Sequence, residues 1–173
     1  DLNGANIIID AQENLWIIDF FHTHKGHILK DLIKLENDLL YIFTPINDLE
    51  DFLEVLKISD ILVNVSDLAK PLPNGETIGL KNPMIKRTYE MVQILRSFYP
   101  SLVKSDRNPT QLFIGQLRYA MHSLVFDECK YWQKKWALYN SGNFCKLIVE
   151  RFRETKQLRV DYISNKHIKD NAL

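Results

Sequence analysis

Three oxygen-bearing side chains near the start of the sequence have types and spacing that suit a metal-dependent reaction. Asp1 precedes Asn6 by five positions, and Asp19 follows two short apolar runs. Mg²⁺ takes few protein ligands, prefers oxygen, and completes its octahedron with water and phosphate oxygens. An amide and a carboxylate brought close together therefore suit this ion. A carboxylate just upstream, such as Asp1, can orient or deprotonate a hydroxyl group.

A β-hairpin is the element expected to position Asn6 and Asp19. Two strand-like runs, Ile7–Asp10 and Leu15–Ile18, are joined by a connection of four residues. If the last residue of the first strand pairs with the first residue of the second, Asn6 faces Asp19. Directly opposed residues have β-carbons about 5 Å apart. This register predicts that the two side chains lie side by side at the open end of the hairpin.

The rest of the chain is expected to be helical. Apolar residues recur at helical spacing from Ile28 to Phe43, Pro45 ends this helix, and Asn47 with Glu50 has the spacing of a capping box. The Pro- and Gly-containing stretch 66–81 is predicted to be a surface loop. Further elements are predicted as helices over 83–98, 109–126 and 129–155 and a terminal strand over 159–164. The prediction is an α+β, mainly helical fold with residues 1–173 in a single domain.

The hairpin and the residues before it resemble the catalytic and metal-binding segments of kinase-like phosphotransferases. Residues 1–6 read Asp-Leu-Asn-Gly-Ala-Asn, and residues 17–20 read Ile-Ile-Asp-Phe. In kinases the catalytic Asp precedes an Asn by five positions, and a second Asp follows a hairpin. The pattern is closer to the aminoglycoside phosphotransferases than to the protein kinases. The stretch from Asp19 to Glu36 looks like a bacterial group, the ternary-complex-associated domain proteins, whose kinase-like core is thought to serve conflict or signalling systems.

The resemblance implies a role for four residues. Asp1 is implied as the catalytic base or hydroxyl-orienting group, and Asn6 and Asp19 as ligands of an Mg²⁺ ion that bridges the phosphates of ATP or another nucleoside triphosphate. Asp31 matches an acid early in the following helix, which in relatives supports the catalytic loop by accepting backbone hydrogen bonds. The implied activity is transfer of the nucleotide γ-phosphoryl group to an unidentified hydroxyl acceptor.

The resemblance also implies a fold: the C-terminal lobe of a protein-kinase-like protein, with the N-terminal lobe missing. The chain opens on Asp1 inside the motif, so we expect a fragment that is inactive by itself. An alternative is a non-catalytic, pseudokinase-like module that binds a protein partner in a bacterial conflict or signalling system. A third is an all-helical regulatory domain with a coincidental hairpin. A phosphate-binding loop and a strand Lys upstream would favour the enzyme.

Other chemically suggestive residues have simpler interpretations. The histidines of a His-x-His-x-x-His pattern, His22, His24 and His27, suggest a transition-metal site, but polar loop residues are the expectation. Trp132 and Trp136 lie among lysines, as they would on an amphipathic helix. The group Arg118, Tyr119 and His122 is consistent with an acceptor cleft, and packing is the expected role.

Composition narrows the classes of protein further. Apolar residues make up 46% and charged residues 25%, a balance typical of globular domains. The 22 basic and 22 acidic side chains cancel, so we expect neither nucleic acid nor membrane as a partner. No apolar run reaches the roughly 20 residues of a membrane span. Cys129 and Cys145 have no metal or redox spacing and are expected as reduced, mostly buried thiols in a cytoplasmic protein.

Overall fold

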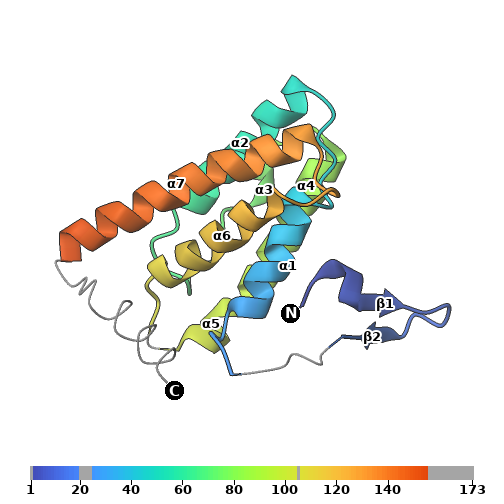
Figure 1. Ribbon diagram of the computed structural model, residues 1–173, viewed down its shortest axis with the longest axis horizontal. Helices are drawn as coiled ribbons and strands as arrows, with labels where there is room; N and C mark the ends of the chain where they lie inside the picture. Colours follow the sequence, from blue (N-terminus) through green and yellow to red (C-terminus); the bar gives the residue numbers. More distant parts are fainter. Residues whose placement is uncertain (1, 20–24, 105, 156–173) are drawn as a thin grey trace, which may run out of the picture.

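A helical body and a separate two-stranded ribbon make up the computed structural model, which describes residues 2–19, 25–104 and 106–155 (Figure 1). The N-terminal part contains a 3₁₀ helix η1 (Gly4–Asn6) and strands β1 (Ile7–Ile9) and β2 (Leu15–Ile17). The body contains α1 (Lys30–Tyr41), α2 (Leu49–Val63), α3 (Gly75–Ile78), α4 (Pro83–Ser97), α5 (Tyr99–Val103), α6 (Thr110–Ser123) and α7 (Tyr131–Thr155).

The prediction of a mainly helical fold with a small antiparallel hairpin is confirmed. The predicted surface loop over 66–81 also contains the short helix α3. The predicted strand over 159–164 and the predictions for Asp1, His22 and His24 lie outside the described residues. No helix within the described ranges combines the length and apolar character that crossing a membrane requires.

Side-chain caps begin several of the helices, α2 and α4 among them. Asn82 precedes Pro83, and its side-chain oxygen accepts from the Met84 amide at 2.9 Å. The sequence predicts Asn47 as the cap of α2, but the N-cap is the next residue, Asp48. The Asp48 carboxylate accepts from the Asp51 amide at 2.9 Å. Asp51 in turn accepts from the Asn47 backbone amide at 3.0 Å. The first half of a capping box is therefore present, one position later than predicted, whereas Asp51 reaches back to the residue before the cap and not to the amide of the cap itself.

The main core forms where α7 packs against α1, α2 and α6. Trp136 on α7 is fully buried, donates its indole N–H to Ser59 Oγ of α2 at 2.7 Å, and packs edge-on against Tyr41 of α1 at 5.2 Å between ring centroids. Lys135, the residue before Trp136 on α7, is exposed, and its ammonium lies 4.7 Å from the Trp132 ring centroid. With Trp136 in the core and Lys135 exposed, α7 is amphipathic as predicted.

A buried carboxylate connects four helices. Glu36 of α1 receives two hydrogen bonds from Arg96 of α4, at 2.7 and 3.0 Å. Gln116 of α6 donates to the same carboxylate at 2.8 Å, and the Tyr99 hydroxyl of α5 donates at 3.3 Å. All four residues are buried. Because a buried charge needs both a counter-ion and hydrogen bonds, this network fixes how α1, α4, α5 and α6 pack.

The hairpin register differs from the prediction by one residue. Ile7 pairs with Ile17 and Ile9 with Leu15, whereas the predicted register paired Asp10 with Leu15. The cause is the turn, because the Asp10 amide donates to the Asn14 carbonyl at 3.1 Å and leaves three loop residues instead of four. Glu13 completes that loop in the left-handed region, with φ of 63°, the arrangement usual in three-residue hairpin loops.

Asp10 organises this turn through its carboxylate. It accepts from the backbone amides of Gln12 and Asn14, from the Asn14 side chain, and from the Trp16 indole N–H at 2.9 Å. The Trp16 and Asn14 side-chain hydrogen bonds lower the pKa of Asp10 from 3.8 to about 2. Hydrogen bonding to the charged form favours ionisation.

This turn should therefore lose its support only in strong acid. The pKa of Asp10 is lower in the folded protein than in the unfolded chain, so its ionised carboxylate stabilises the fold. This stabilisation is fully present above the unfolded pKa of about 3.9 and is lost as the pH falls through the folded pKa of about 2. The NMR shift of the Trp16 indole proton should titrate with a midpoint near 2. A midpoint near 4 would contradict the hydrogen-bonded turn, and Asp10→Asn should remove the titration.

Candidate functional site

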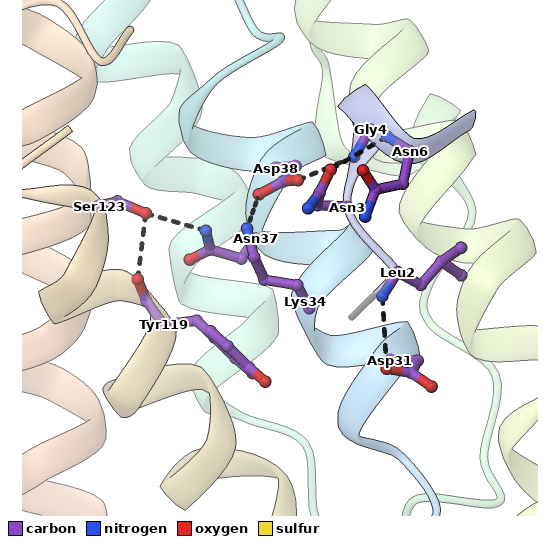
Figure 2. Close-up of polar contacts among 10 residues, drawn as sticks. All are labelled: Leu2, Asn3, Gly4, Asn6, Asp31, Lys34, Asn37, Asp38, Tyr119 and Ser123. Atoms are coloured by element: carbon purple, nitrogen blue, oxygen red, sulfur yellow. Dashed lines mark hydrogen bonds and ion pairs between the residues drawn. The ribbon is translucent and has the colours of Figure 1, made fainter. Parts of the chain in front are cut away.

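The loop before the hairpin is held against α1 by backbone hydrogen bonds to two carboxylates. Asp31, the acid that the resemblance assigns to loop support, accepts from the Leu2 amide at 3.4 Å, and Asp38 accepts from the Gly4 amide at 3.0 Å (Figure 2). The two acids are seven positions apart, or about two helical turns, and so lie on the same face of α1. The loop is thus fastened to one helix at two points.

Asp38 is the stronger of the two anchors. It is almost fully buried and forms an ion pair with Lys34 at 2.6 Å, one turn earlier on α1. The neighbouring Asn37 donates its side-chain amide to Ser123 of α6 at 2.9 Å (Figure 2). The sequence interpretation missed Asp38 and Lys34. Their signal was available in the spacing of Asp31, Lys34 and Asp38, which puts three charges on one helical face.

Removing the Asp38 charge should loosen the loop more than removing that of Asp31. Asp38→Asn takes away the partner of a largely buried ammonium, so we expect a loss of about 1.5–3 kcal/mol in the free energy of unfolding. Asp31 is exposed, and its bond to Leu2 is long, so Asp31→Asn should cost under about 0.5 kcal/mol. Chemical denaturation measures both, and hydrogen exchange at Gly4 should accelerate in Asp38→Asn. Equal losses of unfolding free energy in the two variants would contradict the stronger role of Asp38.

Glycine at position 4 permits a close contact between the loop and Phe43, the second residue after α1. A β-carbon at position 4 would overlap the end of the Phe43 ring, so a larger residue would require the ring to move from its place over the loop. A cavity of about 330 Å³ opens next to this contact. Its lining comes from the loop, α1 and the segment after α6, and includes Asn3, Gly4, Lys34, Asp38, Phe43 and Phe126.

The structure brings Asn6 and Asp19 to the same end of the ribbon but not opposite each other. The Asn6 carbonyl accepts from the Ile18 amide at 2.9 Å, so Asn6 faces Ile18 and Asp19 lies one residue beyond. The predicted pairing of Asn6 with Asp19 is therefore wrong, because the shorter turn shifts the register by one residue. Asn6 is buried and ends η1, whose first turn Asn3 caps through a side-chain bond to the Asn6 amide at 3.1 Å.

Asp19 adopts an uncommon backbone conformation. Its φ is 54°, in the left-handed region that residues other than glycine rarely occupy. Its carboxylate is exposed, and strand alternation no longer sets its direction because the residue has left the extended conformation. Backbone strain of this kind costs on the order of 1–3 kcal/mol and concentrates at functional sites.

Of the three histidines in the His-x-His-x-x-His pattern, His27 lies in the described part of the chain. Its Nε2 is 2.8 Å from Gln111 Oε1, and its Nδ1 accepts from the Leu29 amide at 3.2 Å at the start of α1. Both ring nitrogens thus have protein partners. Among the described residues no group of three or more His, Cys, Asp and Glu side chains lies close enough to hold a metal ion. Of the two free cysteines, Cys129 is buried and Cys145 is exposed.

Comparison with known proteins identifies a family for this chain. A family model described as "Ternary complex associated domain 9" matches residues 1–125, from the loop through α6 and the two residues after it. No curated protein matches the chain, and neither does any solved structure. The matched segment contains the loop, the hairpin and both acids of α1 that hold the loop.

Proposed function

We propose that this chain, which belongs to the ternary complex associated domain 9 family, is the C-terminal lobe of a kinase-like phosphotransferase. The observation that carries the proposal is the anchoring of Leu2 and Gly4 on α1 by carboxylates. A catalytic loop must be rigid, because phosphoryl transfer depends on positioning and electrostatics. This loop leads directly into the ribbon end where Asn6 and Asp19 lie.

The donor set at that end fits Mg²⁺. Asn6 offers an amide oxygen and Asp19 an exposed carboxylate, and few protein ligands leave room for water and phosphate oxygens. These two residues would hold the ion, which would screen the negative charge of the nucleotide phosphates. The strained φ of Asp19 supports a functional role for its carboxylate.

The proposed reaction follows from these roles. The acceptor hydroxyl oxygen forms a bond to the γ-phosphorus of the nucleoside triphosphate, and the bond from that phosphorus to the bridging oxygen of the departing diphosphate breaks. The hydroxyl proton passes to the carboxylate of Asp1, the residue that the resemblance assigns as base. Asp31 and Asp38 act on the loop backbone and not on the substrate.

The exposed ribbon supports the presence of a second lobe. Its apolar side chains include Ile9, Leu15 and Trp16, which are 67%, 62% and 57% exposed. A two-stranded hairpin is marginally stable alone, and clustered exposed apolar residues mark interaction surfaces. We propose that a nucleotide-binding N-terminal lobe packs on this ribbon in the full-length protein.

Binding of Mn²⁺, which shares the oxygen-ligand preference of Mg²⁺, tests the metal assignment on the chain itself. Paramagnetic Mn²⁺ should broaden the NMR signals of Asn6 and Asp19 before those of the helical body. Asp19→Asn should abolish the selective broadening, and Asp60→Asn, an exposed acid on α2, should leave it unchanged. Broadening that survives in Asp19→Asn would contradict the assignment.

The same exposed ribbon favours a second candidate function. A non-catalytic module that binds a protein partner would also present apolar side chains on both strands, such as Ile8 and Ile17. The loop and its anchors would then be retained for structure. The two functions differ in ATP turnover by the full-length protein, which only the phosphotransferase should show.

A further inference from the structure

A second cavity adjoins the loop on the side of α6. It measures about 250 Å³ and lies between the loop, α1 and α6. Its lining includes Asn3 from the loop, Lys30 and Lys34 from α1, and Arg118, Tyr119 and His122 from α6. The ribbon and α6 lie on opposite sides of α1 (Figure 1). The pocket therefore opens on the α6 side of α1, whereas the ribbon that ends at Asp19 lies on the other side.

The lining of this pocket is cationic. Lys30, Lys34 and Arg118 contribute three positive charges from two helices, and no Asp or Glu of the described residues lines it. Lys34 shares its charge with Asp38 in the ion pair at 2.6 Å. Arg118 is exposed and can turn toward a ligand in the pocket, and its planar guanidinium suits a carboxylate or phosphate.

Tyr119 gives the second observation that points to a ligand. The residue is only 7% exposed, and its hydroxyl has no hydrogen-bond partner in the described part of the protein. Its ring extends from α6 into the space toward α1, below Lys34 (Figure 2). The Arg118 guanidinium and the Lys34 ammonium lie 5.6 and 5.9 Å from its ring centroid. Buried polar groups are nearly always hydrogen-bonded, so an unsatisfied hydroxyl requires an explanation.

The Tyr119 hydroxyl is suited to donate to an anion. Burial raises its pKa, the Asp31 and Asp38 charges act in the same direction, and Arg118 opposes them. The group therefore keeps its proton at neutral pH. A protonated phenol beside a guanidinium supplies two hydrogen-bond donor groups and one positive charge within the same pocket.

We propose that this pocket binds an oxyanion, a phosphate or carboxylate group, carried by the phosphoryl acceptor. The inference rests on the proposed phosphotransferase function, because it names the acceptor class of that site. In an in-line transfer the attacking and departing oxygens lie on opposite sides of the phosphoryl group. An anion on the α6 side of the loop therefore belongs to the acceptor, whereas nucleotide phosphates belong with Asn6 and Asp19.

Titration of the chain with inorganic phosphate, followed by NMR against a chloride control of equal ionic strength, tests the pocket. We expect saturable binding that shifts the signals of Arg118 and Tyr119. Arg118→Gln should weaken binding about tenfold or more, since a hydrogen bond to a charged group is lost. Arg87→Gln, the same change at an exposed position of α4, should leave the affinity within twofold. Unchanged affinity in Arg118→Gln, or no saturation, would overturn the proposal.

Two further measurements test the role of Tyr119 and separate the acceptor from the nucleotide as the source of the anion. Tyr119→Phe removes only the unsatisfied hydroxyl, and we expect weaker phosphate binding in a protein of unchanged fold. Phosphate binding should also be the same with and without Mg²⁺ and in Asp19→Ala. Binding that requires Mg²⁺ and disappears in Asp19→Ala would assign the anion to the nucleotide side and overturn the inference. Neither result depends on ATP turnover, so this test can fail or succeed separately from the proposed function.

Discussion

Replacement of Arg96 by Met should lower the free energy of unfolding by about 3–5 kcal/mol, because it leaves the Glu36 charge buried without its counter-ion. Arg96 supplies two of the hydrogen bonds to that carboxylate, at 2.7 and 3.0 Å. Gln116 and Tyr99 remain as donors, but neither carries a compensating charge. Since small domains are stable by about 5–15 kcal/mol, the loss is a large fraction of the total. Urea unfolding followed by circular dichroism measures it.

Arg107→Met is the matched control. Arg107 is exposed and lies 3.9 Å from Asp67, and surface ion pairs contribute about 1 kcal/mol or less. The double variant Arg96→Met with Glu36→Leu should recover much of the lost stability, because a buried pair replaced by apolar residues of similar volume is often tolerated. Arg96→Met that costs no more than Arg107→Met would show that the buried network does not hold the helices together.

Replacement of Asp19 by Ala in the full-length protein should lower turnover of Mg²⁺–ATP by about 10²–10³-fold. This is the usual effect of removing one group that stabilises transition-state charge. The exposed position of Asp19 beyond the last strand pair means that its side chain packs against little. The loss should therefore appear in kcat with little change in melting temperature. Asp60→Ala on α2 provides a control with the same change of charge, and its turnover should match that of the wild type.

The hairpin shows where sequence periodicity succeeds and where it fails. The runs at Ile7 and Leu15 correctly predict two antiparallel strands, because β-branched and apolar residues between turn signals favour strands. The register depends instead on the side chain of Asp10 and on the left-handed φ of Glu13. Apolar patterns contain no information about either feature. The turn predicted from the sequence is therefore one residue longer than the turn in the structure.

Charged residues account for most of what the sequence interpretation missed in the helical body. Glu36, Arg96 and Asp38 lie in helices whose apolar stripes were visible, and charged residues in such helices normally face solvent. Their burial depends on partners from elements distant in sequence, such as the 60 positions between Glu36 and Arg96. Asp31 was predicted only through the family resemblance, and its contact with Leu2 is a bond between segments that periodicity cannot relate.

Phosphoryl transfer by the full-length protein is the most direct test of the central claim. The measurement is release or transfer of the γ-phosphoryl group from ATP in the presence of Mg²⁺, in the wild type and in Asp1→Asn and Asp19→Ala. The phosphotransferase account predicts Mg²⁺-dependent turnover that falls by at least about a hundredfold in each variant. Wild-type rates in both variants would contradict the mechanism, and a well-folded wild-type protein without turnover would identify the chain as part of a non-catalytic interaction module.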